Sequence, residues 1–118
     1  MAYKTITEKD SKHERLARFM QQEMRRKDEQ ALMDILNSKS GRWFLMRFLD
    51  RTRVLGETFT GNSQTFYNEG LRKAGLLILS DIQQLGIEAV KLKQQAELEY
   101  IETQKRAREI ATEYLEGE

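Results

Sequence analysis

The 118-residue chain contains no proline, and this absence constrains its fold more than any other feature. About six prolines would be expected at the ordinary frequency near 5%. Proline costs about 3 kcal/mol inside a helix, so chains built of long helices tend to exclude it. In addition, no stretch alternates apolar and polar residues over the length of a strand. The sequence therefore predicts an all-α fold, a small helical bundle with a long protruding C-terminal helix.

Composition excludes several kinds of chemistry. The chain has no cysteine and one histidine, His13, so it lacks disulfides, thiolate metal sites and histidine clusters. It has no glycine-rich phosphate loop and no convincing catalytic triad. Glu69 is the one carboxylate among apolar residues, and an ion pair with Arg47 or Arg72 that fixes helix packing explains it better than a general base does. We expect no enzymatic activity, no metal and no cofactor.

The N-terminal region is strongly charged. Residues 1–10 are polar and are expected to form a mobile arm. A helix is expected to begin after Asp10 or Ser11, where Ser11 and Glu14 have capping-box spacing. It carries a narrow apolar stripe, formed by Leu16, Phe19, Met20 and Met24.

The end of this first helix is ambiguous in the sequence. Arg25, Arg26 and Lys27 suit a helix C-terminus, because cations favour the negative end of the helix dipole. Asp28 can then cap a second short helix that carries Leu32 and Leu36. Alternatively, the two segments run on as one bent helix.

A buried pair of apolar helices is predicted in the centre of the fold, over Gly41–Val54 and Gln64–Leu85. The turn at residues 37–41 precedes them, and the loop at 56–63 separates them, with Phe59 expected to pack on the core. Close approach of the two helices is expected at Gly70 and Ala74, which lie one turn apart. The predicted core motif consists of Trp43, Phe48, Phe66, Glu69, Gly70, Arg72, Ala74 and Gly75.

The last helix is predicted from Ile87 to about Leu115, after a break at Gly86. One stripe with a mean spacing near 3.6 residues runs from Leu85 to Tyr114 and can pack on the chain's own core. A second apolar face needs another partner, and a second copy is the simplest one; this predicted interface consists of Ile87, Val90, Leu98 and Ile101. The predicted division is an arm (1–10), a helical core (11–86) and a C-terminal helix (87–118).

The charge balance is nearly neutral but uneven. Residues 1–60 hold 13 Lys and Arg against 9 Asp and Glu, whereas residues 61–118 hold 7 against 10. A net charge of +1 argues against binding driven mainly by nucleic-acid phosphates, although non-specific DNA contact through Arg25, Arg26 and Lys27 stays open. No apolar run approaches the roughly 18 residues of a membrane span, so we expect none.

A family resemblance is carried by the stretch from Ala31 to Leu79. It includes the helix start at Gly41-Arg42 and, most tellingly, Phe66-Tyr67-Asn68-Glu69-Gly70-Leu71-Arg72 followed by Lys73, Gly75 and Leu76. This order resembles a family of small helical phage proteins, typified by a protein of the head-gene cluster of a Bordetella podophage. Leu71 departs from the family pattern, in which a basic residue is usual. Both ends of the chain lie outside the resemblance.

The resemblance implies a product of the virion genes of short-tailed phages and carries no catalytic residues with it. We therefore expect a structural or assembly component of the virion, located at the portal, the tail or the internal genome-ejection apparatus. Its partners would be further copies of itself and other virion proteins. It would reside in the virion, and in the host cytoplasm during assembly. The alternative is a phage regulator that binds a host protein or DNA in the infected cell.

Overall fold

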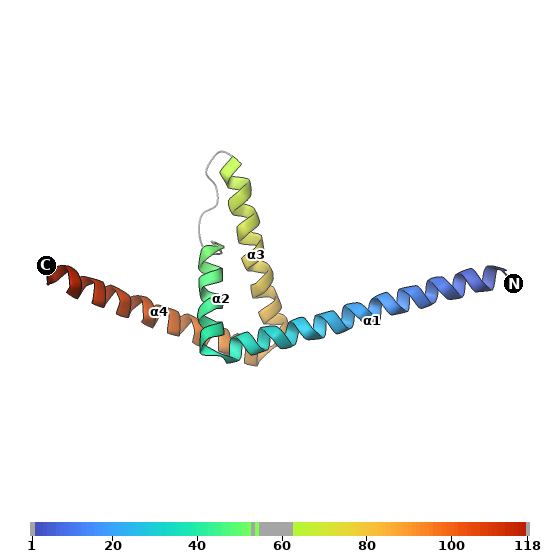
Figure 1. The fold of residues 1–118 in the computed structure, drawn as a ribbon, viewed down its shortest axis with the longest axis horizontal. Helices are drawn as coiled ribbons and strands as arrows, with labels where there is room; N and C mark the ends of the chain where they lie inside the picture. The colour runs from blue at the N-terminus through green and yellow to red at the C-terminus, as the bar shows by residue number, and fades with distance from the viewer. Residues whose placement is uncertain (1, 53, 55–62, 118) are drawn as a thin grey trace. The chain divides into compact units, whose positions relative to one another are not determined.

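The structure, a computed structural model, describes residues 2–52, 54 and 63–117, and for residues 2–10 and 63–66 the backbone alone. Within these residues the chain forms helices and no strand, which confirms the predicted all-α class (Figure 1). The helices are α1 (Ala2–Asn37), α2 (Lys39–Arg51), α3 (Ser63–Leu85) and α4 (Ile87–Glu116). The predicted contact of Phe59 with the core and the side chain of Phe66 lie outside the described residues.

The chain divides into two compact units, Met1–Ala31 and Leu32–Glu118. In the first unit the described residues form the greater part of α1 and nothing else. The second unit contains the end of α1, from Leu32 to Asn37, together with α2, α3 and α4. The proposed division of the chain into arm, core and C-terminal helix stays a prediction.

The bounds of α1 differ from those expected. The helix begins at Ala2 and continues through Ser11 and Asp28 to Asn37, so a helix start at Asp10 or Ser11 and a cap at Asp28 are both wrong. The alternative of one continuous helix is the one that holds. The reason is physical: residues 2–37 contain neither glycine nor proline, and a capping motif starts a helix only where the preceding backbone is not already helical.

A single residue, Ser38, separates α1 from α2. Its backbone is extended (φ −106°, ψ 142°), and its hydroxyl oxygen accepts a hydrogen bond from the Gly41 amide at 2.8 Å. This satisfies one of the amides that lack a partner in the first turn of a helix. Because Ser38 caps the helix, α2 begins at Lys39, within the predicted turn. The helix ends at Arg51, three residues before the predicted end at Val54.

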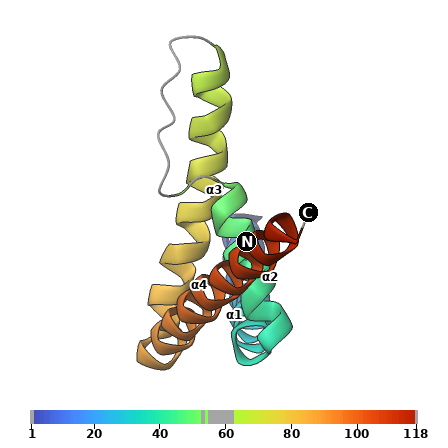
Figure 2. The ribbon, with the colours of Figure 1, turned by 90° about the vertical axis from the view of Figure 1, so that its left-hand side faces the viewer.

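The core of the second unit lies where α4 packs on α2 and α3. Helix α4 contacts both of these helices, and α2 contacts α3 (Figure 2). Leu36 at the end of α1, Ile82 of α3 and Ala89 of α4 are almost completely buried. Leu45 and Leu49 of α2 and Val54 just beyond it complete the cluster. Burial of these aliphatic side chains is what holds the unit together.

The expectation that the Trp43 segment lies wholly within the core is wrong. Leu45 and Leu49 are buried, but Trp43 is 42% exposed and Phe44 is 67% exposed. A helix that is apolar nearly all round can bury only the sides on which it has neighbours. Among the described residues α2 has such neighbours in α3 and α4, so its remaining side faces solvent.

Helices α3 and α4 are joined by Gly86 alone, as the sequence predicts. Its backbone has φ +105° and ψ −170°, a conformation that residues with a Cβ rarely adopt. Ile87 then starts α4, and Val90 donates the first helical hydrogen bond to the Gly86 carbonyl at 3.2 Å. The end of α4 at Glu116 is within one residue of the predicted end.

Candidate protein-interaction surfaces

Arg42 of α2 connects three helices of the second unit. Its Nε donates to both carboxylate oxygens of Glu99 on α4, at 2.9 and 3.2 Å. One of its terminal nitrogens donates to the carbonyl of Leu36 at 2.9 Å, in the last turn of α1, where carbonyls lack a partner within the helix. The Arg42 side chain is only 10% exposed. This ion pair therefore fixes the position of α4 on α2.

Tyr100 forms a second polar connection between the same helices. Its hydroxyl donates to Asp50 Oδ2 at 2.6 Å and accepts from Arg47 at 3.1 Å. Its ring stacks on Trp43, with centroids 5.2 Å apart and planes inclined by 21°. The hydrogen bond to Tyr100 raises the pKa of Arg47 above its usual value, with a smaller contribution from the Asp50 charge. Arg47 thus stays cationic in this cluster.

Sequence reasoning missed both connections. It left Arg47 and Arg72 open as partners of Glu69, and that pairing stays a prediction; on α2 and α4, Arg47 pairs with Asp50 and donates to Tyr100. The signal for Tyr100 was present, because this residue lies on the apolar stripe of α4 that was expected to face the core. No comparable signal existed for Arg42 and Glu99, since they are 57 residues apart and nothing local relates them.

The inward stripe of α4 is buried over only half of the helix. Ala89, Ala96 and Tyr100 are buried, and Leu92 packs against the core. Beyond Tyr100 every described residue of α4, from 101 to 117, is exposed. The later members of the same stripe, Ile110 and Tyr114, are 60% and 71% exposed. The last part of α4 therefore lacks packing contacts within the described part of the chain.

The predicted interface residues lie on the outer side of α4. Ile87 is 73% exposed, Leu98 63% and Ile101 61%, whereas Val90 is half-buried. These side chains share one side of α4 and leave large aliphatic groups exposed there, which favours an interaction site. Whether these residues contact another molecule stays a prediction.

The predicted core motif is only partly brought together. Ala74 and Glu69 are half-buried, Phe48 packs against the core cluster, and Arg72 is exposed. The close approach is made by Gly75, where a Cβ would collide with the side chains of Thr52 and Val54. Gly70 is exposed, and none of the described residues comes within 4 Å of a Cβ placed there. The assignment of the close contact to Gly70 is thus wrong by about one turn and a half.

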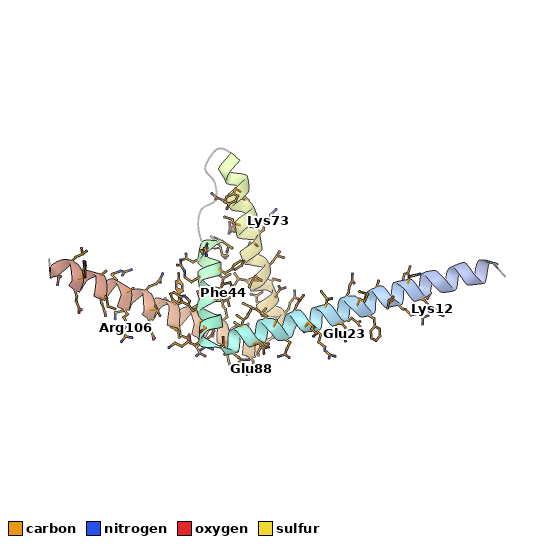
Figure 3. All side chains as sticks on the ribbon, viewed as in Figure 1. Lys12, Glu23, Phe44, Lys73, Glu88 and Arg106 are labelled. Carbon is orange, nitrogen blue, oxygen red and sulfur yellow. The ribbon has the colours of Figure 1, made fainter. Side chains whose placement is uncertain are left out.

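The apolar stripe of α1 is the clearest surface feature of the first unit. Leu16, Phe19, Met20 and Met24 are each about 60% exposed or more, and they line a shallow apolar groove with Glu23 and Lys27. In Figure 3, the side chains around Glu23 and Lys12 extend from a single helix. The stripe was predicted, and it is as exposed as the outer face of α4.

The basic residues proposed for phosphate contact lie on α1. Arg25 pairs with Glu29 at 3.1 Å and Arg26 with Glu23 at 3.8 Å, and all four side chains are largely exposed. Lys27 lines the apolar groove. Acidic neighbours within the helix partly neutralise this cluster, which weakens the case for binding nucleic-acid phosphates. His13 is exposed on the same helix.

Metal sites and membrane spans are both absent from the described part of the chain. Within it, no group of three or more His, Asp or Glu side chains is arranged to hold a metal ion. Nor is any helix there long and apolar enough to cross a membrane.

Comparison with known proteins identifies a family. No curated protein and no solved structure matches the chain. Residues 32–94, however, match the family described as Bbp19-like phage proteins. The match covers more than half of the chain, begins with the first residue of the second unit and extends into α4. It includes all but the first residue of the stretch from Ala31 to Leu79 that carries the resemblance. The chain therefore belongs to the family of Bbp19-like phage proteins.

Proposed function

We propose that this phage protein is a non-enzymatic, virion-associated assembly component that acts through contacts between helices. The proposal rests on one observation above all: Leu98 and Ile101 stand more than 60% exposed on α4. The helix that carries them is fixed on its other side by the Arg42–Glu99 ion pair and by Tyr100. A rigid helix with an exposed apolar face is suited to binding another helix.

The outer face of α4 would bind further copies of the protein or other virion proteins. Membership of a phage family is consistent with a role in the portal, the tail or the genome-ejection apparatus, and with a location in the virion and the host cytoplasm. The competing function is regulation, in which α1 would contact DNA or a host protein. The pairing of Arg25 and Arg26 with acidic neighbours favours the assembly role.

The test is the molar mass of the purified protein by light scattering, over a range of concentrations and at two salt concentrations. We expect a discrete oligomer whose mass does not change when duplex DNA is added. Leu98→Asp with Ile101→Asp should reduce the mass, because two carboxylates cannot be buried in an apolar contact without a large desolvation cost.

A matched control separates the loss of the apolar face from the added charge. Ser80→Asp with Gln83→Asp introduces the same two charges, with the same three-residue spacing, at exposed polar positions of α3 and should leave the mass unchanged. A mass that the Leu98 and Ile101 substitutions leave untouched would show that this face is not the interface. A monomer that gains mass only with DNA, and loses it at high salt, would favour the regulator.

A further inference from the structure

The two exposed apolar stripes of this protein are flanked by charges of opposite sign. One stripe, on α1, consists of Leu16, Phe19, Met20 and Met24, and the other, on the last part of α4, contains Ile110 and Tyr114. The flanking charges follow from the regular geometry of each helix, in which successive residues are rotated by about 100°. The position of each stripe relative to its flanking charges is therefore set by its own helix alone.

The α1 stripe has a basic edge. Arg15 and Arg26 lie within about 20° of one another around the helix, on the side of the stripe where Phe19 lies. Lys12 lies on this side one turn before the stripe. Both arginine side chains are exposed: Arg26 is 80% exposed and makes only a long, exposed ion pair with Glu23 at 3.8 Å, and Arg15 donates to the Ser11 carbonyl at 3.4 Å.

The α4 stripe has an acidic edge. Four glutamates fall within an arc of about 60° on one side of Ile110 and Tyr114; they are Glu102, Glu109, Glu113 and Glu116. All four are exposed. One base, Arg106, lies between this edge and the apolar stripe.

The relative placement of these rows determines how the two helices could pair. Viewed from the N-terminus of each helix, the basic row and the acidic row lie on the same side of their apolar stripes. When two helices pack face to face, edges on the same side meet only in an antiparallel arrangement; in a parallel pair, opposite edges meet. An antiparallel pair of α1 and α4 would therefore bring the basic row against the acidic row.

The spacing along the helices also matches. Arg15 and Arg26 are eleven residues apart, as are Glu102 and Glu113, which corresponds to about 16 Å along either axis. In the antiparallel register that places Arg15 beside Glu113, Arg26 is beside Glu102. The same register brings Lys12 level with Glu116.

The remaining residues of the two faces agree with this register. Arg106, which lies between the acidic row and the apolar stripe, comes within one residue of the level of Glu23, the one acid in the α1 groove. Ile110 and Tyr114 come level with residues 18 and 14, on either side of Leu16, and Phe19 lies one residue beyond this stretch. The register that the two ion pairs define therefore also brings Arg106 close to Glu23 and the two apolar stripes against one another.

We propose that the α1 stripe binds the last part of α4 from a second copy of this protein, in an antiparallel helix pair with Arg15 beside Glu113 and Arg26 beside Glu102. The inference deepens the proposed function, since it names the partner and polarity of one self-contact, and it uses a surface of α4 different from Leu98 and Ile101. The contact joins two different surfaces, so it can produce a reciprocal pair, a ring or an open chain of copies.

Charge reversal tests the proposal directly. Arg15→Glu with Arg26→Glu gives a chain whose two edges are both acidic, and Glu102→Arg with Glu113→Arg gives a chain whose two edges are both basic. Each variant alone should associate about tenfold or more weakly than the wild type by light scattering, because like charges would then face one another. Circular dichroism checks that the helical content of each variant is retained.

Mixing the two variants supplies the decisive result. In the mixture the acidic α1 edge of one variant meets the basic α4 edge of the other, and the reverse contact is attractive as well. Association should return, as a complex that contains both variants. If each variant is weakened but the mixture stays dissociated, or if both variants associate like the wild type, the proposal is wrong.

Cysteine cross-linking tests the register, and the chain contains no cysteine to interfere. Met20→Cys in one preparation and Ala107→Cys in another should form a mixed disulfide under mild oxidation, because residues 20 and 107 lie on facing stripes within one residue of the same level. Thr112→Cys, on the opposite side of α4, is the matched control and should not cross-link to Met20→Cys. Equal cross-linking of both would refute the antiparallel register.

The results distinguish this inference from the proposed function. If Leu98→Asp with Ile101→Asp lowers the mass and the charge reversals do not, the protein assembles through the outer face of α4 and the α1–α4 pair is wrong. A wild type that is monomeric at every concentration would refute both. A disulfide between Met20→Cys and Ala107→Cys formed in one doubly substituted chain, with no mixed disulfide between chains, would show an internal contact and refute binding of a second copy.

Discussion

At the scale of single residues, Arg42 has the greatest structural consequence. It belongs to α2, donates to a terminal carbonyl of α1 and forms an ion pair with Glu99 of α4, in which one N–H is shared by both carboxylate oxygens. Glu99 also accepts a hydrogen bond from Gln95 at 3.0 Å. A planar guanidinium with several donors is suited to bridge partners on different helices, which a lysine could not do equally well.

Truncation of this arginine should be costly. We predict that Arg42→Ala lowers the free energy of unfolding by about 2–3 kcal/mol, since it leaves Glu99 and the Leu36 carbonyl without their charged donor in a largely buried place. Urea denaturation followed by circular dichroism measures the change. Arg25→Ala, which removes a pair at 3.1 Å on the surface of α1, serves as the control and should cost under about 0.5 kcal/mol. Equal effects would contradict the role given to Arg42.

Two glycines should respond in opposite directions to the same substitution. Gly86→Ala should destabilise the protein by about 1–3 kcal/mol, because φ +105° is strained for any residue with a Cβ. Gly70→Ala should stabilise it by up to about 1 kcal/mol, since Gly70 lies inside α3, is exposed and has open space among the described residues. Thermal unfolding of both variants provides the comparison. A loss of stability in Gly70→Ala would indicate a contact at that position.

At the scale of helices, α4 was predicted more accurately than α1, for identifiable reasons. Gly86 gave an unambiguous start to α4, and the 3.6-residue periodicity from Leu85 to Tyr114 persisted to its end. In α1, Ser11 and Asp28 are residue types that favour the start of a helix, but both lie within one helix that no glycine or proline interrupts. Propensity rules describe what can start a helix, and continuous helical backbone overrides them.

The apolar stripe of α4 could be predicted from the sequence, but the point at which its burial ceases could not. That limit depends on how far α2 and α3 extend along α4, which is a matter of packing between segments far apart in the chain. The same reason explains why Trp43 is exposed on one side and stacks on Tyr100 on the other. Periodicity identifies a face, and the neighbours of that face determine which part of it is buried.

The two halves of α4 should differ in the exchange of their amide hydrogens. Amides between Ala89 and Tyr100 are held by packing and should exchange slowly, whereas those from 101 to 117 rest on local helix hydrogen bonds alone and should exchange faster by at least tenfold, about 1.4 kcal/mol in opening free energy. Hydrogen exchange read by mass spectrometry at low protein concentration measures this. Raising the concentration should slow exchange in the later half if it pairs with another copy.

At the scale of the whole chain, the family match and the compact units coincide at one boundary. Residues 32–94 carry the family match, and the second unit begins at Leu32. Most of α1 lies outside both the family match and the second unit. The described residues that form the core cluster, from Leu36 to Ala89, all lie within the matched range.

Removal of residues 1–31 should therefore leave the second unit folded. We predict a single cooperative unfolding transition for residues 32–118, with a midpoint within about 3 °C of that of the whole chain under dissociating conditions, because none of the core residues is lost. Differential scanning calorimetry measures this. The shortened chain should also self-associate less than the full chain, as the α1 stripe is absent. Loss of the cooperative transition would show that the first unit contributes to the core.

The exposed half of α4 also has an evolutionary consequence. Residues 101–117 carry none of the described core side chains, so substitutions there leave the folding of the second unit largely unaffected. Mutation can therefore alter the apolar pattern and the glutamate row of this stretch without the loss of stability that constrains Ala89 or Ala96. A phage lineage could thus acquire a new binding partner by changing the last turns of one helix while it retains the same scaffold.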